Sequence, residues 1–188
     1  MRIVAGRFRG RRLAALGKGD AGAHLRPTTD RVREALFGML DGGRFGDVID
    51  GARVLDLFAG TGALGLEALS RGAVQVTFVD DGRKAQALLR ENIATLGVRD
   101  AVRLIARDAL RLPPADAPCD LVFLDPPYGK GLGAKALSGA QAQGWIAPGA
   151  LIVWEENAPQ LAPDGFTLLE TRGYGDTTVT LLEAMTGP

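Results

Sequence analysis

A short run of hydrogen-bond acceptors, Asp125-Pro126-Pro127-Tyr128, follows an apolar stretch at residues 120–124. The two prolines remove two backbone donors and stiffen the turn, so carbonyl groups face outward beside the carboxylate of Asp125. A patch made only of acceptors suits an amino group, which has two hydrogens to donate. Tyr128 can stack on the flat ring that carries such an amine. The motif predicts chemistry on an aromatic amino group, and a proline-rich loop around a buried tyrosine is the alternative.

A glycine-rich turn, Asp56-Leu57-Phe58-Ala59-Gly60-Thr61-Gly62, is the second stretch with chemical potential. Glycines lack a Cβ and let the backbone approach a ligand, and the N–H groups that open the following helix can point at it. The dinucleotide-binding spacing is met only if Gly60, Gly62 and Gly65 are counted, and Phe58 stands where its first glycine is expected. An ordinary tight turn is the alternative.

Acidic residues end four successive predicted strands, at Asp56, Asp80, Asp108 and Asp125. Parallel strands joined by right-handed crossovers end at one edge of a sheet, so these carboxylates should ring one crevice at the topological switch point. Helix capping could explain any one of them. The four together favour a ligand site.

The elements that position these residues alternate between strand and helix from residue 53 onward. This order predicts an α/β fold with a doubly wound, Rossmann-like, seven-stranded and mostly parallel sheet. Strands are expected at residues 53–57, 74–79, 101–106, 120–124 and 150–155, and helices at 62–71, 83–96 and 133–143. Residues 166–172 and 176–183 should form an antiparallel C-terminal hairpin at one sheet edge.

The N-terminal residues carry most of the charge asymmetry in a chain whose net charge is zero. Residues 1–33 hold nine of the 22 Lys and Arg but two of the 22 Asp and Glu, which gives them a charge of +7. Two short strands around a turn at residues 6–10 are expected there, with arginines that can bind phosphates and Phe8 able to stack on an unpaired base. A solvated basic hairpin is the alternative.

A helix is expected after Thr28 or Thr29, either of which can cap it. An apolar stripe should dock this helix on the core, and it consists of Val32, Leu36, Met39 and Leu40. The arginines are expected to stay on the polar side, at Arg26, Arg31 and Arg33. Arginines beside threonine hydroxyls suit a phosphate or a substrate loop, although a plain capped helix also explains them.

The numbers of cysteines and histidines and the lengths of the apolar runs limit the classes of function. The single cysteine, Cys119, excludes an intrachain disulfide and a cysteine-based zinc site, and the single histidine, His24, excludes a multi-histidine metal site. We therefore expect no metal. No apolar run reaches the roughly 18 residues that a membrane span needs, and the first residues lack a signal-peptide pattern. A cytoplasmic protein of one domain with a small extension is expected.

Together, Asp56–Gly62 and Asp125–Tyr128 resemble the two signature motifs of class I S-adenosylmethionine-dependent amino-group methyltransferases. Residues 4–11 and 25–34 sharpen the likeness. With them, nearly the whole chain resembles the bacterial methyltransferases that modify the 2-amino group of one guanine in 16S ribosomal RNA. The Asp-Pro-Pro-Tyr motif also occurs in DNA adenine and protein glutamine methyltransferases, so it specifies the amine and not the substrate.

The resemblance implies a role for each matching position. S-adenosylmethionine binding falls to Asp56, Phe58, Ala59, Gly60, Gly62, Asp80, Asp81, Asp108, Ala109 and Asp125. Within this set, Asp56 and the turn hold the methionine end, Asp80 (favoured over Asp81) bonds the ribose, and Asp108 with the backbone of Ala109 faces the adenine. Catalysis falls to Asp125, Pro126 and Tyr128. RNA binding falls to Arg7, Arg9, Arg11, Arg26, Thr28, Thr29, Arg31, Pro127 and Tyr128.

The same resemblance implies a division of labour and a partner. Residues 1–45 form an RNA-contacting extension, and residues 46–188 form the methyltransferase domain. The implied partner is 16S rRNA in a 30S subunit or an assembly intermediate, bound by a monomer without a membrane or a metal. Three alternatives stay open: adenine N6 methylation of DNA or RNA, a nicotinamide oxidoreductase, and an RNA chaperone that binds the cofactor without catalysis. Phe58 and the proline pair argue against the second, and the intact motif argues against the third.

Overall fold

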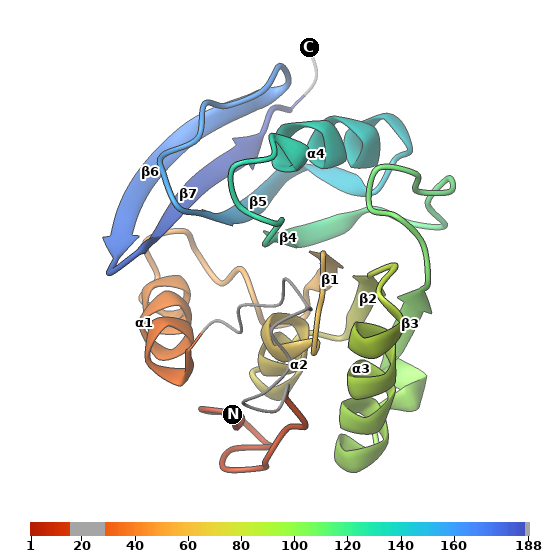
Figure 1. Cartoon of the computed structure of the whole chain (residues 1–188). Helices are drawn as coiled ribbons and strands as arrows, with labels where there is room; N and C mark the ends of the chain where they lie inside the picture. Colours follow the sequence, from red (N-terminus) through yellow and green to blue (C-terminus); the bar gives the residue numbers. More distant parts are fainter. Residues whose placement is uncertain (16–28, 187–188) are drawn as a thin grey trace.

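The computed structural model describes residues 1–15 and 29–186. Seven strands form one sheet in the order β3-β2-β1-β4-β5-β7-β6 (Figure 1). β1 to β5 run parallel, and β7 runs antiparallel between β5 and β6. The strands are β1 (Arg53–Leu57), β2 (Gln75–Val79), β3 (Val102–Ile105), β4 (Cys119–Leu124), β5 (Ile146–Glu156), β6 (Phe166–Tyr174) and β7 (Thr177–Ala184). The predicted doubly wound sheet and its C-terminal antiparallel hairpin are confirmed.

Helices cover both faces of the sheet and bury two hydrophobic clusters against it. α1 (Asp30–Asp41), α2 (Ala63–Ser70) and α3 (Arg83–Leu96) pack on one face, and α4 (Leu132–Ala142) packs on the other (Figure 1). A 3-10 turn, η1 (Arg99–Ala101), leads into β3. The strand order reverses between β1 and β4, which are neighbours in the sheet. This is the switch point where α/β sheets bind ligands.

The helix and strand boundaries follow local sequence signals closely. α3 spans the predicted residues and ends at Gly97, whose φ of +68° is the left-handed cap conformation that glycine adopts without strain. β5 begins four residues earlier than predicted, at Ile146. Ile146 pairs with Cys119 across a register shift in the ladder, and an irregular pairing of this kind leaves no clean periodicity in the sequence.

The N-terminal hairpin differs from the predicted pair of strands, because only Arg2 and Arg12 form a β-bridge. The amides of Val4 and Ala5 donate instead to the Glu67 carboxylate on α2, at 2.8 and 3.0 Å. Gly6 lies so close to α2 that a Cβ would stand 1.9 Å from the Ser70 carbonyl oxygen. We call residues 1–13 the basic arm. It is docked against α2 and not free in solvent.

α1 begins at the cap residue Thr29, whose hydroxyl accepts from the Val32 amide at 3.3 Å. Leu36, predicted to dock on the core, is fully buried, and so is the adjacent Phe37. The expectation that Arg33 stays on the polar side is wrong, because its side chain is completely buried. Its guanidinium donates to the Arg2 carbonyl and to Asp30, and lies 3.8 Å from Glu67. Arg33 is therefore a structural tie between α1, the basic arm and α2.

The basic arm and α1 share one hydrophobic cluster with α2 and α3, through Ile3, Leu13 and Leu40 among others. No described helix is both long and apolar enough to span a membrane. Cys119 is buried, and burial raises the pKa of its thiol to about 11. The predictions for His24, Arg26 and Thr28 lie outside the described residues.

Candidate active site at the carboxyl ends of the strands

The glycine turn after β1 has a strained backbone at Phe58. Its φ of +58° makes it the one non-glycine residue with a positive φ among those described. Such a conformation costs on the order of 1–2 kcal/mol for a residue with a Cβ. The turn is held in place when Ala59 donates its amide to the Val79 carbonyl and Gly60 donates to the Asp80 carboxylate at 2.8 Å. Strain that neighbours maintain in this way is typical of a functional site.

Gly62 and Gly65 open α2 directly after this turn. A Cβ on Gly65 would lie 2.5 Å from the Phe78 ring, so this glycine allows α2 to pack closely on β2. Its amide donates to the buried Asp56 carboxylate at 3.0 Å. The expectation that the N–H groups opening this helix can point at a ligand is therefore wrong for Gly65, whose amide is bonded within the chain. The amide of Gly60, in the preceding turn, is also bonded within the chain.

The acidic residues after β2 and β3 use only part of their capacity to accept hydrogen bonds within the chain. Asp80 is half-buried and accepts from the amides of Gly60 and Gly82, both at 2.8 Å. Asp81 is exposed. Asp108 follows β3 after a short gap and accepts from the Leu110 amide at 2.9 Å, beside the buried Ala109. Each carboxylate oxygen that accepts one hydrogen bond keeps capacity for another.

Asp125 lies at the end of β4, where its amide approaches the Leu57 carbonyl of β1 at 3.4 Å. No residue among 1–15 and 29–186 donates a hydrogen bond to its carboxylate. Burial raises the pKa of Asp125 well above its ordinary value, and the charges of Glu155, Asp56 and Glu156 raise it further. The carboxylate is thus an acceptor to which the described part of the chain offers no donor, and its surroundings disfavour its charge.

Burial also raises the pKa values of Asp56 and Asp80, and backbone amides oppose the shift at both. Burial raises the pKa of Asp56 well above its ordinary value, against the opposing hydrogen bond from Gly65. Burial also raises the pKa of Asp80, partly offset by the amides of Gly60 and Gly82. The predicted convergence of carboxylates at one edge of the sheet is found for Asp56, Asp80 and Asp125, since the charge of Asp80 acts on Asp56 and the charge of Asp56 acts on Asp125. We call these three residues and Glu155 the acidic rim.

Sequence reasoning missed Glu155 and Glu156, which end β5 and are both buried. The register pairs Leu124 with Trp154, so Glu155 follows in line with Asp125. The signal was present, because the rule that singled out acids at the ends of four strands applies equally to the fifth. Thr177, at the start of β7, was missed for lack of any local pattern.

The loop after Asp125 is tied to neighbouring strands. The Tyr128 hydroxyl lies 3.4 Å from Oγ1 of Thr177, and the Gly129 amide donates to Glu156 at 3.3 Å. Tyr128 is half-buried, and burial raises the pKa of its hydroxyl. Pro126 is buried and Pro127 half-buried, and both follow trans peptide bonds. The four residues of the motif thus form a loop whose ends are fixed on β4, β5 and β7.

Three of the arginines assigned to RNA, Arg7, Arg9 and Arg11, lie away from the acidic rim. The Arg7 amide donates to the Ser70 carbonyl at the far end of α2, and Arg7 and Arg9 are exposed. The N-terminal hairpin lies at this end of α2 (Figure 1). Arg11 donates to the Thr95 carbonyl at 2.6 Å. Phe8 packs against the core and carries the Arg7 guanidinium 4.4 Å above its ring, so it is not a free stacking platform. Thr29 and Arg31 are exposed.

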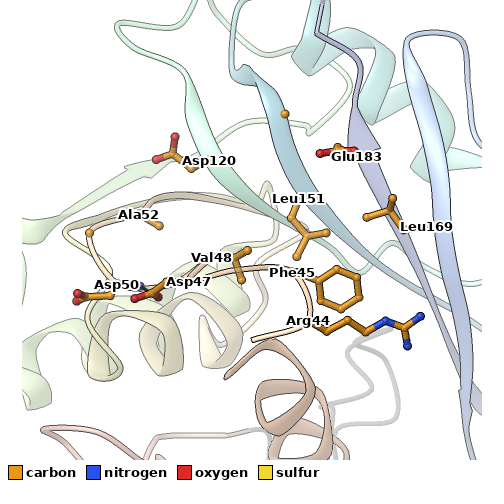
Figure 2. A pocket seen from close by; sticks show the side chains of 12 residues that line it. Arg44, Phe45, Asp47, Val48, Asp50, Ala52, Asp120, Leu151, Leu169 and Glu183 are labelled. Atoms are coloured by element: carbon orange, nitrogen blue, oxygen red, sulfur yellow. Dashed lines mark hydrogen bonds between the residues drawn. The ribbon is translucent and has the colours of Figure 1, made fainter. Parts of the chain in front are cut away.

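A cavity of about 660 Å³ lies at the opposite edge of the sheet, where β1, β4 and β5 begin (Figure 2). Its acidic side chains include Asp47, Asp50, Asp120 and Glu183. Asp120 already accepts from the Arg53 amide at 2.9 Å. None of the motif residues lines this cavity, so it is separate from the candidate site. The described residues contain no cluster of His, Cys, Asp or Glu arranged to hold a metal.

Comparison with known proteins identifies the group to which this architecture belongs. The model of the family described as "Conserved hypothetical protein 95" matches residues 1–183. The chain belongs to this family. It is 40% identical over 172 residues to ribosomal RNA small subunit methyltransferase D of Escherichia coli, covering 89% of this chain and 82% of the relative.

A solved structure of similar sequence shares the whole fold. A putative methyltransferase of Escherichia coli, YhhF, superposes with a TM-score of 0.82 at 36% identity, covering 100% of this chain and 99% of the other. A more distant relative is the tRNA (guanine(6)-N2)-methyltransferase of Thermus thermophilus, 32% identical over 144 residues that span 69% of this chain and 42% of the relative. The family member described here is a methyltransferase, and the fold is the one that class I methyltransferases use.

Proposed function

We propose that this methyltransferase transfers a methyl group from S-adenosylmethionine to the 2-amino group of a specific guanine in 16S ribosomal RNA. The observation that carries the proposal is the Asp125 carboxylate, which has no donor among the described residues and stands beside a rigid pair of prolines. The names of the relatives support the RNA substrate. The Thermus thermophilus relative is named for guanine N2, which supports the amine over other positions.

The acidic rim fits the proposed cofactor. Burial raises the pKa values of Asp56, Asp80 and Asp125, and neighbouring carboxylates raise them further: Asp80 acts on Asp56, Asp81 on Asp80, and Glu155 on Asp125. S-adenosylmethionine supplies the methyl group on a positively charged sulfonium. A cation placed beside the rim removes part of the repulsion and is therefore favoured there. This charge match is the physical reason for assigning the cofactor to this edge of the sheet.

The residues that would hold the cofactor are those of the glycine turn and the two following strand ends. Asp56 with Phe58, Ala59, Gly60 and Gly62 would hold the methionine end. Asp80 suits the ribose better than Asp81, because its carboxylate is directed at the turn through Gly60 whereas Asp81 is exposed. Asp108 and the backbone of Ala109 would face the adenine.

The catalytic contribution of the chain would be mainly positioning. A guanine amine is a poor nucleophile because its lone pair is drawn into the ring. Asp125 and the Pro126 carbonyl can hold its two N–H groups, which turns the lone pair out of the ring plane. Tyr128 and Pro127 can cover the base once it is flipped out of its stack. Alignment of this kind contributes up to roughly 7–11 kcal/mol. The raised pKa of Asp125 suits a carboxylate that takes the proton during or after transfer.

RNA binding would use the basic arm and α1, and so divides the chain at about residue 45. Arg7 and Arg9 lie beyond the far end of α2, whose eight residues span roughly 12 Å. Thr29 and Arg31 of α1 and Arg11 of the arm are further candidates, as are Arg26 and Thr28, which lie outside the described residues. An RNA that contacts both the arm and the rim must be folded, which favours 16S rRNA in a 30S subunit or an assembly intermediate. We further propose a cytoplasmic monomer that acts without a metal.

The deciding experiment offers labelled S-adenosylmethionine together with 30S particles, naked 16S rRNA or duplex DNA. The expected result is label in 16S rRNA that digests to N2-methylguanine. Mapping rRNA from cells with and without the protein should then locate the modified nucleotide. Label recovered as N6-methyladenine, in DNA or RNA, would replace the guanine assignment with the adenine alternative.

A further inference from the structure

The backbone of the loop that carries Tyr128 can adopt more than one conformation. Gly129 and Gly131 have φ values of +72° and +62°, both are exposed, and no atom of the described chain would contact a Cβ at either position. Fixing one residue in a single conformation costs roughly 1–2 kcal/mol, so a loop with two such glycines needs external anchors to keep one shape. Two prolines stiffen the start of the loop, but they do not restrain the residues beyond Tyr128.

Glu156 supplies the first anchor from the end of β5. The residue is 3% exposed. One carboxylate oxygen, Oε2, accepts from the Gly129 amide at 3.3 Å and from its own neighbour, Asn157, at 3.1 Å. Because Gly129 directly follows Tyr128, this contact fixes the backbone immediately after the residue that carries the aromatic ring.

Thr177 supplies the second anchor from the start of β7. Its Oγ1 lies 3.4 Å from the Tyr128 hydroxyl. β7 is held between β5 and β6, and its next residue, Thr178, pairs with Glu156 in the ladder. Both anchors therefore come from one rigid piece of the sheet, which adjoins the strand that ends at Asp125.

We propose that Glu156 and Thr177 are positioning residues that fix the Tyr128 ring relative to Asp125, and so set the angle at which the substrate base is held. This inference rests on the proposed function, in which Tyr128 covers the guanine. It gives the C-terminal hairpin a part in methyl transfer. Glu156 acts as a hydrogen-bond acceptor for the loop backbone and does not touch the substrate.

The test compares Glu156→Ala with Glu156→Gln in methyl transfer to RNA by the full chain. Losing the acceptor frees the loop, and we expect kcat to fall roughly 10-fold with the KM for S-adenosylmethionine unchanged. The amide oxygen of glutamine can still accept from both Gly129 and Asn157, so Glu156→Gln should keep kcat within about 3-fold of the original. A glutamine variant as slow as the alanine variant would overturn the proposal. Glu183→Ala, exposed at the other end of β7, is the matched control.

Double variants separate positioning from general structural support. Thr177→Val should slow transfer roughly 3-fold, since it removes a long hydrogen bond, and should have no further effect once Tyr128→Phe has removed the hydroxyl. Glu156→Ala should likewise add little to Tyr128→Ala. Effects that multiply in the double variants would overturn the positioning role. If Tyr128→Ala alone leaves RNA methylation unchanged, the failure belongs to the proposed function.

Discussion

Glu67 and Asp125 are two carboxylates of one framework, and their surroundings are opposite. Glu67 is fully buried beneath the basic arm, where it accepts from the Val4, Ala5 and Arg71 N–H groups and faces Arg33. Asp125 is partly exposed at the acidic rim and receives no hydrogen bond from the described residues. A buried charge with all its partners is a structural tie, whereas an acceptor left open in a site that disfavours its charge is poised for a ligand.

The largest expected effect comes from removing the open acceptor. Asp125→Ala should lower kcat for RNA methylation roughly 10³-fold or more, because one of the two acceptors for the amine is lost. Calorimetry should show S-adenosylmethionine affinity within a few-fold of the original. The exposed Asp164→Ala should change neither quantity. A loss of cofactor affinity as large as the loss of activity would contradict the role given to Asp125.

Removing the Glu67 carboxylate, which has all its hydrogen-bond partners, should lower the stability of the fold. Glu67→Ala leaves the Arg33 guanidinium and two arm amides without this partner, and we expect the free energy of unfolding to fall by about 3–5 kcal/mol. Urea unfolding measures the loss, and hydrogen exchange at Val4 and Ala5 should accelerate most. Glu91→Ala, at an exposed position on α3, should stay within about 0.5 kcal/mol. A Glu67 variant as stable as this control would remove the distinction between the two carboxylates.

The acidic rim should also make stability depend on pH. A carboxyl whose pKa is higher in the folded state than its unfolded value of about 3.9 binds more protons when folded, so stability falls as pH rises through the folded pKa. Asp56, Asp80 and Asp125 all have this sign. Asp125→Asn should therefore flatten the profile and raise the unfolding temperature by a few degrees at pH 8, while leaving it unchanged near pH 4. If the unfolding temperature of this variant at pH 8 is no higher than that of the original protein, the proposed repulsion among these carboxylates is contradicted.

The smallest effect is expected at the tip of the basic arm. Arg7→Ala and Arg9→Ala together should weaken RNA binding a few-fold at moderate salt, and should reduce the slope of log affinity against log salt by about 0.7–0.9 for each phosphate that is no longer neutralised. Filter binding over a salt series measures both. Lys135→Ala, exposed on α4 across the sheet, is the control. An unchanged slope would remove the arm tip from RNA recognition.

The parts of the fold that follow local rules were predictable from the sequence. Strand β1 and helix α3 occupy the predicted residues, because apolar periodicity and a terminal glycine define them without help from distant contacts. The convergence of Asp56, Asp80 and Asp125 followed from topology alone. Arg33 could not be predicted in the same way, since its burial depends on Glu67 and the Arg2 carbonyl, which are far away in the sequence.

The basic arm and the hairpin contacts were also beyond local reasoning. The amides of Val4 and Ala5 in the arm are taken by Glu67 of α2, and no residue within the arm reveals that partner. Thr177 meets Tyr128 only because β7 inserts between β5 and β6. Glu156 is different, because its place at a strand end was visible and the rule was simply not extended to it.

Asn92 on α3 connects the glycine turn with the segment that leaves the basic arm. Its side-chain amide donates to the Thr61 carbonyl in the turn and to the Ala14 carbonyl, and its oxygen accepts from the Ala14 amide. A single buried side chain thus holds both segments at once. Removing the Asn92 side chain would therefore untie the glycine turn and Ala14 together.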